Sequence, residues 1–160
     1  MQTLRWLGGF VAGVVVAAGL GSLFQTQYNL SRIAALGEPV PMSLRLLTMV
    51  QDLIHFAPIY AIIVAAGFLV AFAVAGLLSG VFKSHRAMLY PAAGFTAIIA
   101  ALLIMSAMLP VTAISAARSG LGMLFLSLFG ALGAWLHARI TDKTVESDTT
   151  VGTETAARSH

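Results

Sequence analysis

Residues 58–82 read PIYAIIVAAGFLVAFAVAGLLSGVF and contain no Lys, Arg, Asp or Glu. A helix of this length is roughly 38 Å long, which exceeds the ~30 Å hydrocarbon core of a bilayer. Three more segments are equally free of these charged residues and long enough to approach or reach a full crossing, at residues 7–24, 89–111 and 120–138. The sequence therefore predicts an all-α membrane protein with four transmembrane helices in an up-down bundle.

The composition leaves no room for a separate soluble domain. The chain has 160 residues, of which 59% are hydrophobic and 9% charged, and its mean hydropathy is +0.92. Soluble domains carry about 25% charged residues. We therefore predict one membrane domain over residues 1–140. A tail over residues 141–160, rich in Thr, Ser and acidic residues, is expected to be disordered because it has too little apolar surface to fold.

The distribution of basic residues predicts the orientation. Lys and Arg near one set of span ends number five (Arg5, Lys83, Arg86, Arg139 and Lys143), against three at the other set (Arg32, Arg45 and Arg118). The positive-inside rule then places both termini in the cytoplasm, and we expect a multi-pass protein of a bacterial inner membrane. The first apolar segment could be a cleaved signal peptide, but its length favours a retained span.

Metal and cofactor chemistry finds little support in the sequence. The chain has no cysteine, which excludes disulfides, thiolate zinc sites and iron–sulfur clusters. His85 and His137 could suggest a haem with two histidine ligands, but one lies in a predicted turn and the other at a helix end. We predict no metal, no cofactor and, with a net charge of only +3, no nucleic-acid partner.

A fifth helix is predicted on the outer side, over about residues 43–56. It follows the break at Pro39 and Pro41, and Ser43 is a suitable N-cap. Apolar residues recur every three or four positions, at Leu46, Leu47, Val50, Leu53 and Ile54, whereas Arg45, Thr48, Asp52 and His55 fall on the other side. We expect this amphipathic helix to shield its apolar face from water, either in the interface or over the mouth of the bundle, and Pro58 to kink the chain after it.

Small residues are spaced for close helix contact in every span. Lipid supplies no hydrophobic force between helices, so Gly and Ala at four-residue spacing favour association by allowing close approach. The pairs and triplets are Gly9/Gly13, Ala17/Gly21, Gly76/Gly80, Ala93/Ala97/Ala101 and Gly130/Ala134. These faces are expected to line the bundle interior, although a seam between copies of the chain is an alternative.

Polar residues gather at the outer ends of the spans. The candidate binding residues of this cluster are Gln25, Gln27, Asp52, His55, Tyr60, Thr112 and Arg118. If the cluster is a site, Asp52 and Arg118 should be neighbours with His55 beside them. The alternative is that these residues are span ends solvated by water and head groups.

No motif in the chain specifies a reaction, and we assign no catalytic residue. We expect a small non-catalytic protein that acts as an accessory or assembly subunit, or that binds lipid or an apolar small molecule at the outer face. A small oligomeric transporter or channel is the first alternative, and a membrane enzyme using the region of Asp52 and His55 is the second. The expected partners are membrane lipids, with a homo-oligomer or a larger membrane complex possible.

Overall fold

Four long helices account for most of the chain. The computed structural model describes residues 2–81, 86–108 and 114–157. Its elements are α1 (Gln2–Ala35), α2 (Met42–Val81), α3 (Arg86–Met108), the short 3₁₀ helix η2 (Ser115–Arg118) and α4 (Gly120–Ala157). Each of the four long helices contains a stretch long and apolar enough to cross a membrane. The predicted fold class, an all-α four-helix membrane bundle, is confirmed.

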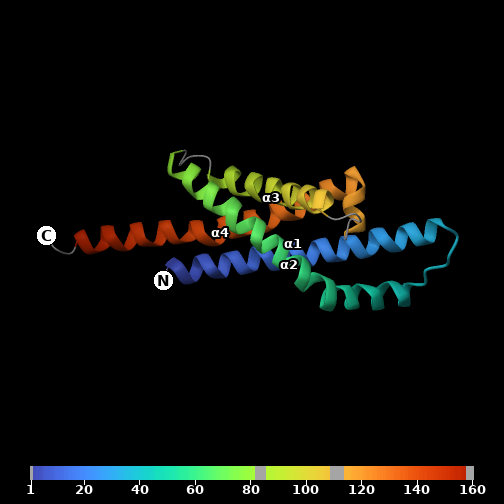
Figure 1. The fold of residues 1–160 in the computed structure, drawn as a ribbon. Helices are drawn as coiled ribbons and strands as arrows, with labels where there is room; N and C mark the ends of the chain where they lie inside the picture. Colours follow the sequence, from blue (N-terminus) through green and yellow to red (C-terminus); the bar gives the residue numbers. More distant parts are fainter. Residues whose placement is uncertain (1, 82–85, 109–113, 158–160) are drawn as a thin grey trace.

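The helices form a closed ring in which each packs on two others. α1 contacts α2 and α4, and α3 likewise contacts α2 and α4. Successive helices run in opposite directions, so the N-terminus and the far end of α2 lie towards one end of the bundle, and the α1–α2 connection and η2 lie at the other (Figure 1). α4 returns towards the N-terminal end. This is the up-down order that the sequence predicted.

Three helices are longer than predicted. α1 does not end at Phe24 but continues to Ala35, and α2 joins the predicted outer helix and the second span into one helix of 40 residues. Pro58 lies inside α2, where it removes a backbone hydrogen bond. The teal first part of α2 and its green remainder run in different directions (Figure 1), as a proline kink would produce. α4 is helical to Ala157, which differs from the predicted disorder of residues 141–160; no proline follows residue 110 to end this helix.

Glycines bring α4 into backbone contact with both of its neighbours. A Cβ atom on Gly13 of α1 would lie 2.6 Å from the carbonyl oxygen of Gly133, and one on Gly94 of α3 would lie 2.6 Å from that of Gly130. The predicted small faces of α1 and α4 thus line the bundle interior. Gly80 has nothing within 4 Å of its built Cβ, so its predicted packing role is wrong.

Aromatic side chains, in contrast, fill the space between α2 and the bundle centre. Tyr60, Phe68 and Phe72 are all buried. Phe72 stacks on Phe68 with 4.7 Å between ring centroids, and it meets Phe10 of α1 edge-on at 6.1 Å. Large side chains therefore fill the space between α1 and α2, whereas α4 touches α1 and α3 through small residues.

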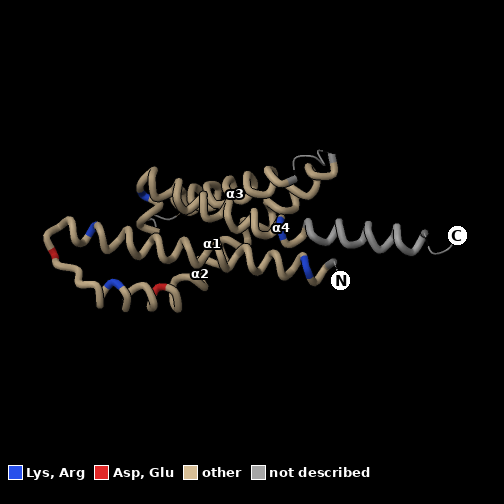
Figure 2. The backbone as a smooth tube through the Cα atoms, turned by 180° about the vertical axis from the view of Figure 1, so that it is seen from behind, with Lys and Arg blue, Asp and Glu red and all other residues tan. Residues whose placement is uncertain are grey.

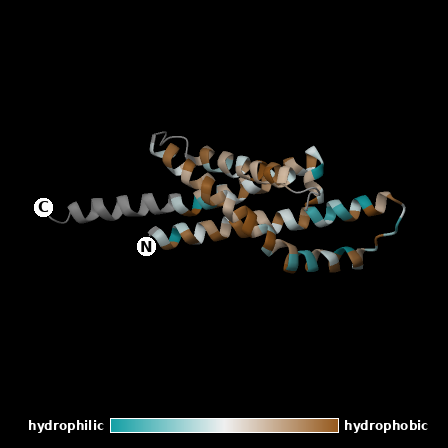
Figure 3. Cartoon of the chain, viewed as in Figure 1, coloured by the Kyte–Doolittle hydropathy of each residue, from teal (hydrophilic) through white to brown (hydrophobic). Residues whose placement is uncertain are grey.

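Charges in the described part of the bundle lie near its two ends. Figure 2 shows Lys, Arg, Asp and Glu towards the ends and an uncharged stretch between them. Hydrophilic residues gather along the second half of α1 and the beginning of α2 (Figure 3). This polar end carries most of the residues that the sequence selected as a candidate site.

Candidate functional site

A seam of polar contacts joins the second half of α1 to the beginning of α2. The Thr26 hydroxyl donates to the Asp52 carboxylate at 2.6 Å. Arg45 Nη1 donates to Gln27 Oε1 at 3.0 Å, and Gln27 Nε2 lies 2.8 Å from the sulfur of Met49. Polar side chains of the two helices therefore satisfy one another, as groups taken out of water must.

This seam determines which face of the amphipathic segment meets the bundle. Its polar face packs on α1, and its apolar face points outward: Leu46 is 57% exposed and Ile54 is 62% exposed. Of the two predicted placements of this apolar face, cover over the mouth of the bundle is wrong, and a place in the interface stays a prediction. The reason is that α1 offers a polar surface here, and an apolar surface facing lipid or a partner has no cost in a membrane setting.

The structure shows separate contacts for three members of the predicted polar cluster. Asp52 is engaged by Thr26, whereas Arg118 lines a pocket with Tyr28 and Ser119. His55 is exposed, and its Nδ1 lies 2.9 Å from the carbonyl oxygen of Gln51 one turn earlier. The structure therefore does not show the predicted group of Asp52, Arg118 and His55.

The remaining predicted site residues have separate surroundings. Tyr60 is a core residue, 2% exposed, whose ring stacks on Phe56 and sits against Gly21. Gln27 belongs to the seam. Gln25 is buried within the bundle, and its Oε1 has no hydrogen-bond partner among the described residues. Thr112 lies outside the residues that the structure describes.

Arg118 belongs to an open pocket of about 560 Å³ where α1, η2 and the start of α4 meet. Its lining residues, all of which except Ile33 carry a polar side-chain group, are Tyr28, Asn29, Arg32, Ile33, Ser115, Arg118 and Ser119. We call it the arginine pocket. Sequence reasoning selected only Arg118 from this set and used Arg32 only in the count of basic residues. The four-residue spacing of Tyr28 and Arg32, which puts them on one helix face, was the signal that could have joined them.

At the other end of the bundle, His137 lies in an aromatic cage. The sequence placed it at a helix end, on the rim of the bundle, but it is fully buried. Its ring stacks on Phe72 at 4.5 Å, meets Trp6 edge-on at 5.6 Å and lies 5.5 Å from Tyr90. The rim position was inferred from sequence distance to the helix end, and the extension of α4 past this point invalidates that inference. His85 lies outside the described residues.

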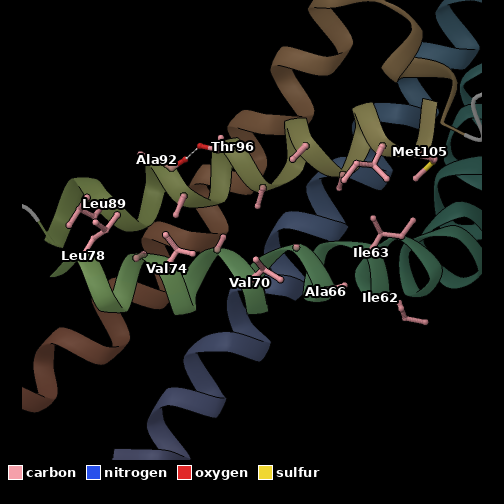
Figure 4. Close-up of a pocket in the computed structure, with 18 residues that line it drawn as sticks. Ile62, Ile63, Ala66, Val70, Val74, Leu78, Leu89, Ala92, Thr96 and Met105 are labelled. Atoms are coloured by element: carbon pink, nitrogen blue, oxygen red, sulfur yellow. Dashed lines mark hydrogen bonds between the residues drawn. The ribbon is translucent and has the colours of Figure 1, made fainter. Parts of the chain in front are cut away.

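Another hollow is an apolar groove between α2 and α3, with a volume of about 890 Å³ (Figure 4). Its α2 wall runs from Ile62 to Leu78, and its α3 wall runs from Leu89 to Met105. All lining residues are apolar except Thr96, whose hydroxyl donates to the Ala92 carbonyl oxygen at 2.5 Å. We call this hollow the α2–α3 groove.

Small side chains account for the groove. The predicted stripe of Ala93, Ala97 and Ala101 lines it, facing α2 across the gap, while Gly94 makes the close contact with α4. On the α2 side, a Cβ on Gly67 would stand 3.6 Å from that of Ala97, an ordinary contact. The helices thus touch near this point and leave space along their outward edges.

In the described part of the chain, we find no arrangement of side chains suited to metal binding or to hydrolysis. No three of its His, Cys, Asp and Glu side chains come together as a metal site requires. A hydrolytic role for Asp52 would need His55 within hydrogen-bond reach, but Thr26 holds the carboxylate and His55 bonds locally.

Comparison of the chain with protein-family models, with curated proteins and with solved structures found no match. The four apolar helices make this a multi-pass membrane protein by their length and composition. The hollows and contacts described above are the features of the chain that bear on a more specific function.

Proposed function

We propose that this protein is a non-catalytic binding protein of the bacterial inner membrane, which holds the apolar chain of a lipid or lipid-like molecule in the α2–α3 groove. The single observation that carries the proposal is the groove itself: about 890 Å³ lined by apolar side chains and one internally bonded threonine. This volume falls in the range of small-molecule sites, roughly 300–1,000 Å³.

The dimensions of the groove favour a long, thin occupant. Its α2 wall spans Ile62 to Leu78, which is roughly 24 Å at 1.5 Å per residue. The hydrocarbon core of a bilayer is about 30 Å thick. An extended chain lying along the two helices would fill such a groove, whereas a compact molecule would leave much of it empty.

The chemistry of the lining excludes polar ligands. Neither wall contributes a charged side chain, and Thr96 already uses its hydroxyl within its own helix. A polar group placed there would lose its hydrogen bonds to water without replacement, at a cost of several kcal/mol by analogy with transfer to hydrocarbon. The occupant must therefore be apolar over the length of the groove.

We propose that both termini are cytoplasmic. The excess of Lys and Arg at one set of span ends supports this orientation. The arginine pocket and the α1–α2 seam then face the outside.

The experiment measures retained molecules directly. The protein is purified in a mild detergent, its native mass is recorded, and the released molecules are quantified by mass spectrometry per mole of protein. Ala66→Phe and Ala100→Phe place a large side chain in the groove from exposed lining positions, one on each wall. Each should lower the retained amount at least about fivefold, since either ring occupies the path of the chain.

Ala73→Phe is the matched control, because Ala73 is exposed on α2 and does not line the groove. It should retain the wild-type amount. A retained polypeptide or second copy, lost from the two groove variants only, would show that the occupant is a transmembrane helix. An empty wild-type protein, or equal loss in the control, would contradict the proposal.

A further inference from the structure

The arginine pocket differs from the α2–α3 groove in place and in chemistry. It lies where α1, η2 and α4 meet, and the two hollows share no lining residue. Two guanidinium groups, Arg32 and Arg118, line it, and no carboxylate does. Like charges facing one hollow repel each other, so a bound anion would relieve the repulsion as well as form charge-assisted hydrogen bonds.

The side chains of the pocket are held in place before any ligand arrives. Arg32 Nη1 donates to the Tyr28 hydroxyl at 3.4 Å, and its guanidinium lies 5.9 Å from the centre of the same ring. The Ser115 hydroxyl donates to Asn29 Oδ1, which ties η2 to α1. A preorganised wall lowers the entropy that binding must offset.

Ser119 completes the wall by capping α4. Its hydroxyl accepts a hydrogen bond from the backbone N–H of Gly122 at 3.0 Å. The N-terminus of the long helix α4 therefore lies beside the two arginines. The positive end of the helix dipole adds to their field. Planar guanidinium groups match the oxygens of a phosphate better than a point charge does.

Counted from the predicted end of the first span, the pocket begins at the depth of lipid head groups. Tyr28 and Ile33 follow the predicted end of the first span at Phe24 by four and nine residues, which corresponds to roughly 6–14 Å along the helix. The head-group layer adds roughly 5–7 Å to each side of the hydrocarbon core. A phosphate of a membrane lipid can therefore reach the inner part of this stretch.

We propose that the arginine pocket is a binding site for a phosphate group, held by Arg32 and Arg118. The group is supplied either by the head group of an anionic phospholipid or by soluble phosphate. This site is independent of the apolar occupant proposed for the α2–α3 groove.

The test uses the full chain in nanodiscs of phosphatidylcholine with a minor fraction of phosphatidylglycerol. Native mass spectrometry counts retained phosphatidylglycerol, and calorimetry measures binding of inorganic phosphate to protein in phosphatidylcholine alone. Arg32→Gln and Arg118→Gln should each weaken whichever binding is present about three- to tenfold, and the double variant should abolish it. Arg32→Lys should fall between wild type and Arg32→Gln, because it keeps the charge but loses the planar fork.

Arg45→Gln is the control. It removes the same charge from the same end of the bundle, but Arg45 bonds to Gln27 in the α1–α2 seam and does not line the pocket. Loss of phosphatidylglycerol alone in the pocket variants supports a lipid site, and loss of phosphate binding alone supports a soluble anion. Unchanged binding in the double variant, an equal loss in Arg45→Gln, or no binding of either probe by the wild type would overturn the proposal.

Discussion

Replacing Gly133 with alanine tests the contact that holds α1 and α4 together. A Cβ on Gly133 would lie 2.3 Å from the carbonyl oxygen of Gly13 and 3.0 Å from the Cβ of Ala17. Real Cβ atoms essentially never approach within 3.0 Å, so the two helices must separate by at least about 0.7 Å at this point. Both nearby atoms are backbone or Cβ atoms, so a change of rotamer relieves neither.

Two opposing effects determine how much the Gly133→Ala substitution changes the unfolding free energy. Forcing an extra methyl group into a packed interface costs about 1–3 kcal/mol. Alanine in place of glycine within a helix returns about 0.5–1 kcal/mol, because the unfolded chain loses less conformational freedom. We therefore expect the Gly133→Ala variant to lose about 1–2 kcal/mol of unfolding free energy.

Gly19→Ala is the matched control, since a Cβ on Gly19 would meet nothing within 4 Å. It should leave stability unchanged or raise it by up to about 1 kcal/mol. Reversible unfolding in mixed micelles of dodecyl maltoside and dodecyl sulfate, followed by the fluorescence of Trp6 and Trp135, measures both variants. If Gly133→Ala proves as stable as Gly19→Ala, α1 and α4 do not touch through their backbones and the packing described above is refuted.

Three further predictions test other parts of the structure. Asp52→Asn and Thr26→Val should each lower the unfolding free energy by about 1–2 kcal/mol, and the double variant should lose less than the sum because both remove one hydrogen bond; strict additivity in the cycle would mean that the bond contributes nothing. A nitroxide at Leu46 should be accessible to oxygen and one at Met49 protected, as their positions on α2 require, and equal accessibility would argue against the rotation of this segment. A reporter active only in the periplasm should work when inserted at Glu38 and fail after the last residue, and the reverse pattern would invert the orientation.

The spans and their order were predictable because bilayer thickness imposes a length on apolar segments. The described parts of residues 58–82 and of the three similar segments lie within long helices of the structure. The helix ends were predicted less well. Polarity after Phe24 marked the end of the apolar core, but it did not mark the end of the helix, since α1 has no glycine or proline between that point and Gly37.

The rotation of the segment at residues 42–56 could not be predicted from its periodicity. The pattern, with apolar Leu46 and Val50 on one face and Asp52 on the other, shows that the helix has an apolar face and a polar face. It does not fix which face packs inward, because in a membrane protein the outward side can be the apolar one. The residues that decide which face packs inward lie in another segment, because Thr26 and Gln27 of α1 form polar contacts with α2.

The same limit applies to the predicted polar cluster. Sequence position gave the membrane depth of Asp52 and Arg118, and both do lie at the polar end of the bundle. The depth of a residue in the membrane does not determine the direction in which its side chain points around the helix axis. Two side chains meet only when both their depths and their directions match. Thr26 and Asn29 are three residues apart on α1, yet the first bonds to Asp52 of α2 and the second to Ser115 of η2.

A lipid in a bilayer has an apolar chain and a charged head group, and each of the two proposed sites suits only one of these parts. The α2–α3 groove has no charged group to hold a head group, and the arginine pocket lacks the two long apolar walls along which a chain could lie. Because the hollows share no residue and lie on different pairs of elements, a filled groove should not alter phosphate binding. Ala100→Phe should therefore empty the groove while the retention of phosphatidylglycerol stays at the wild-type level. Loss of both would mean that a single lipid depends on both hollows, and the separation argued from their linings would fail.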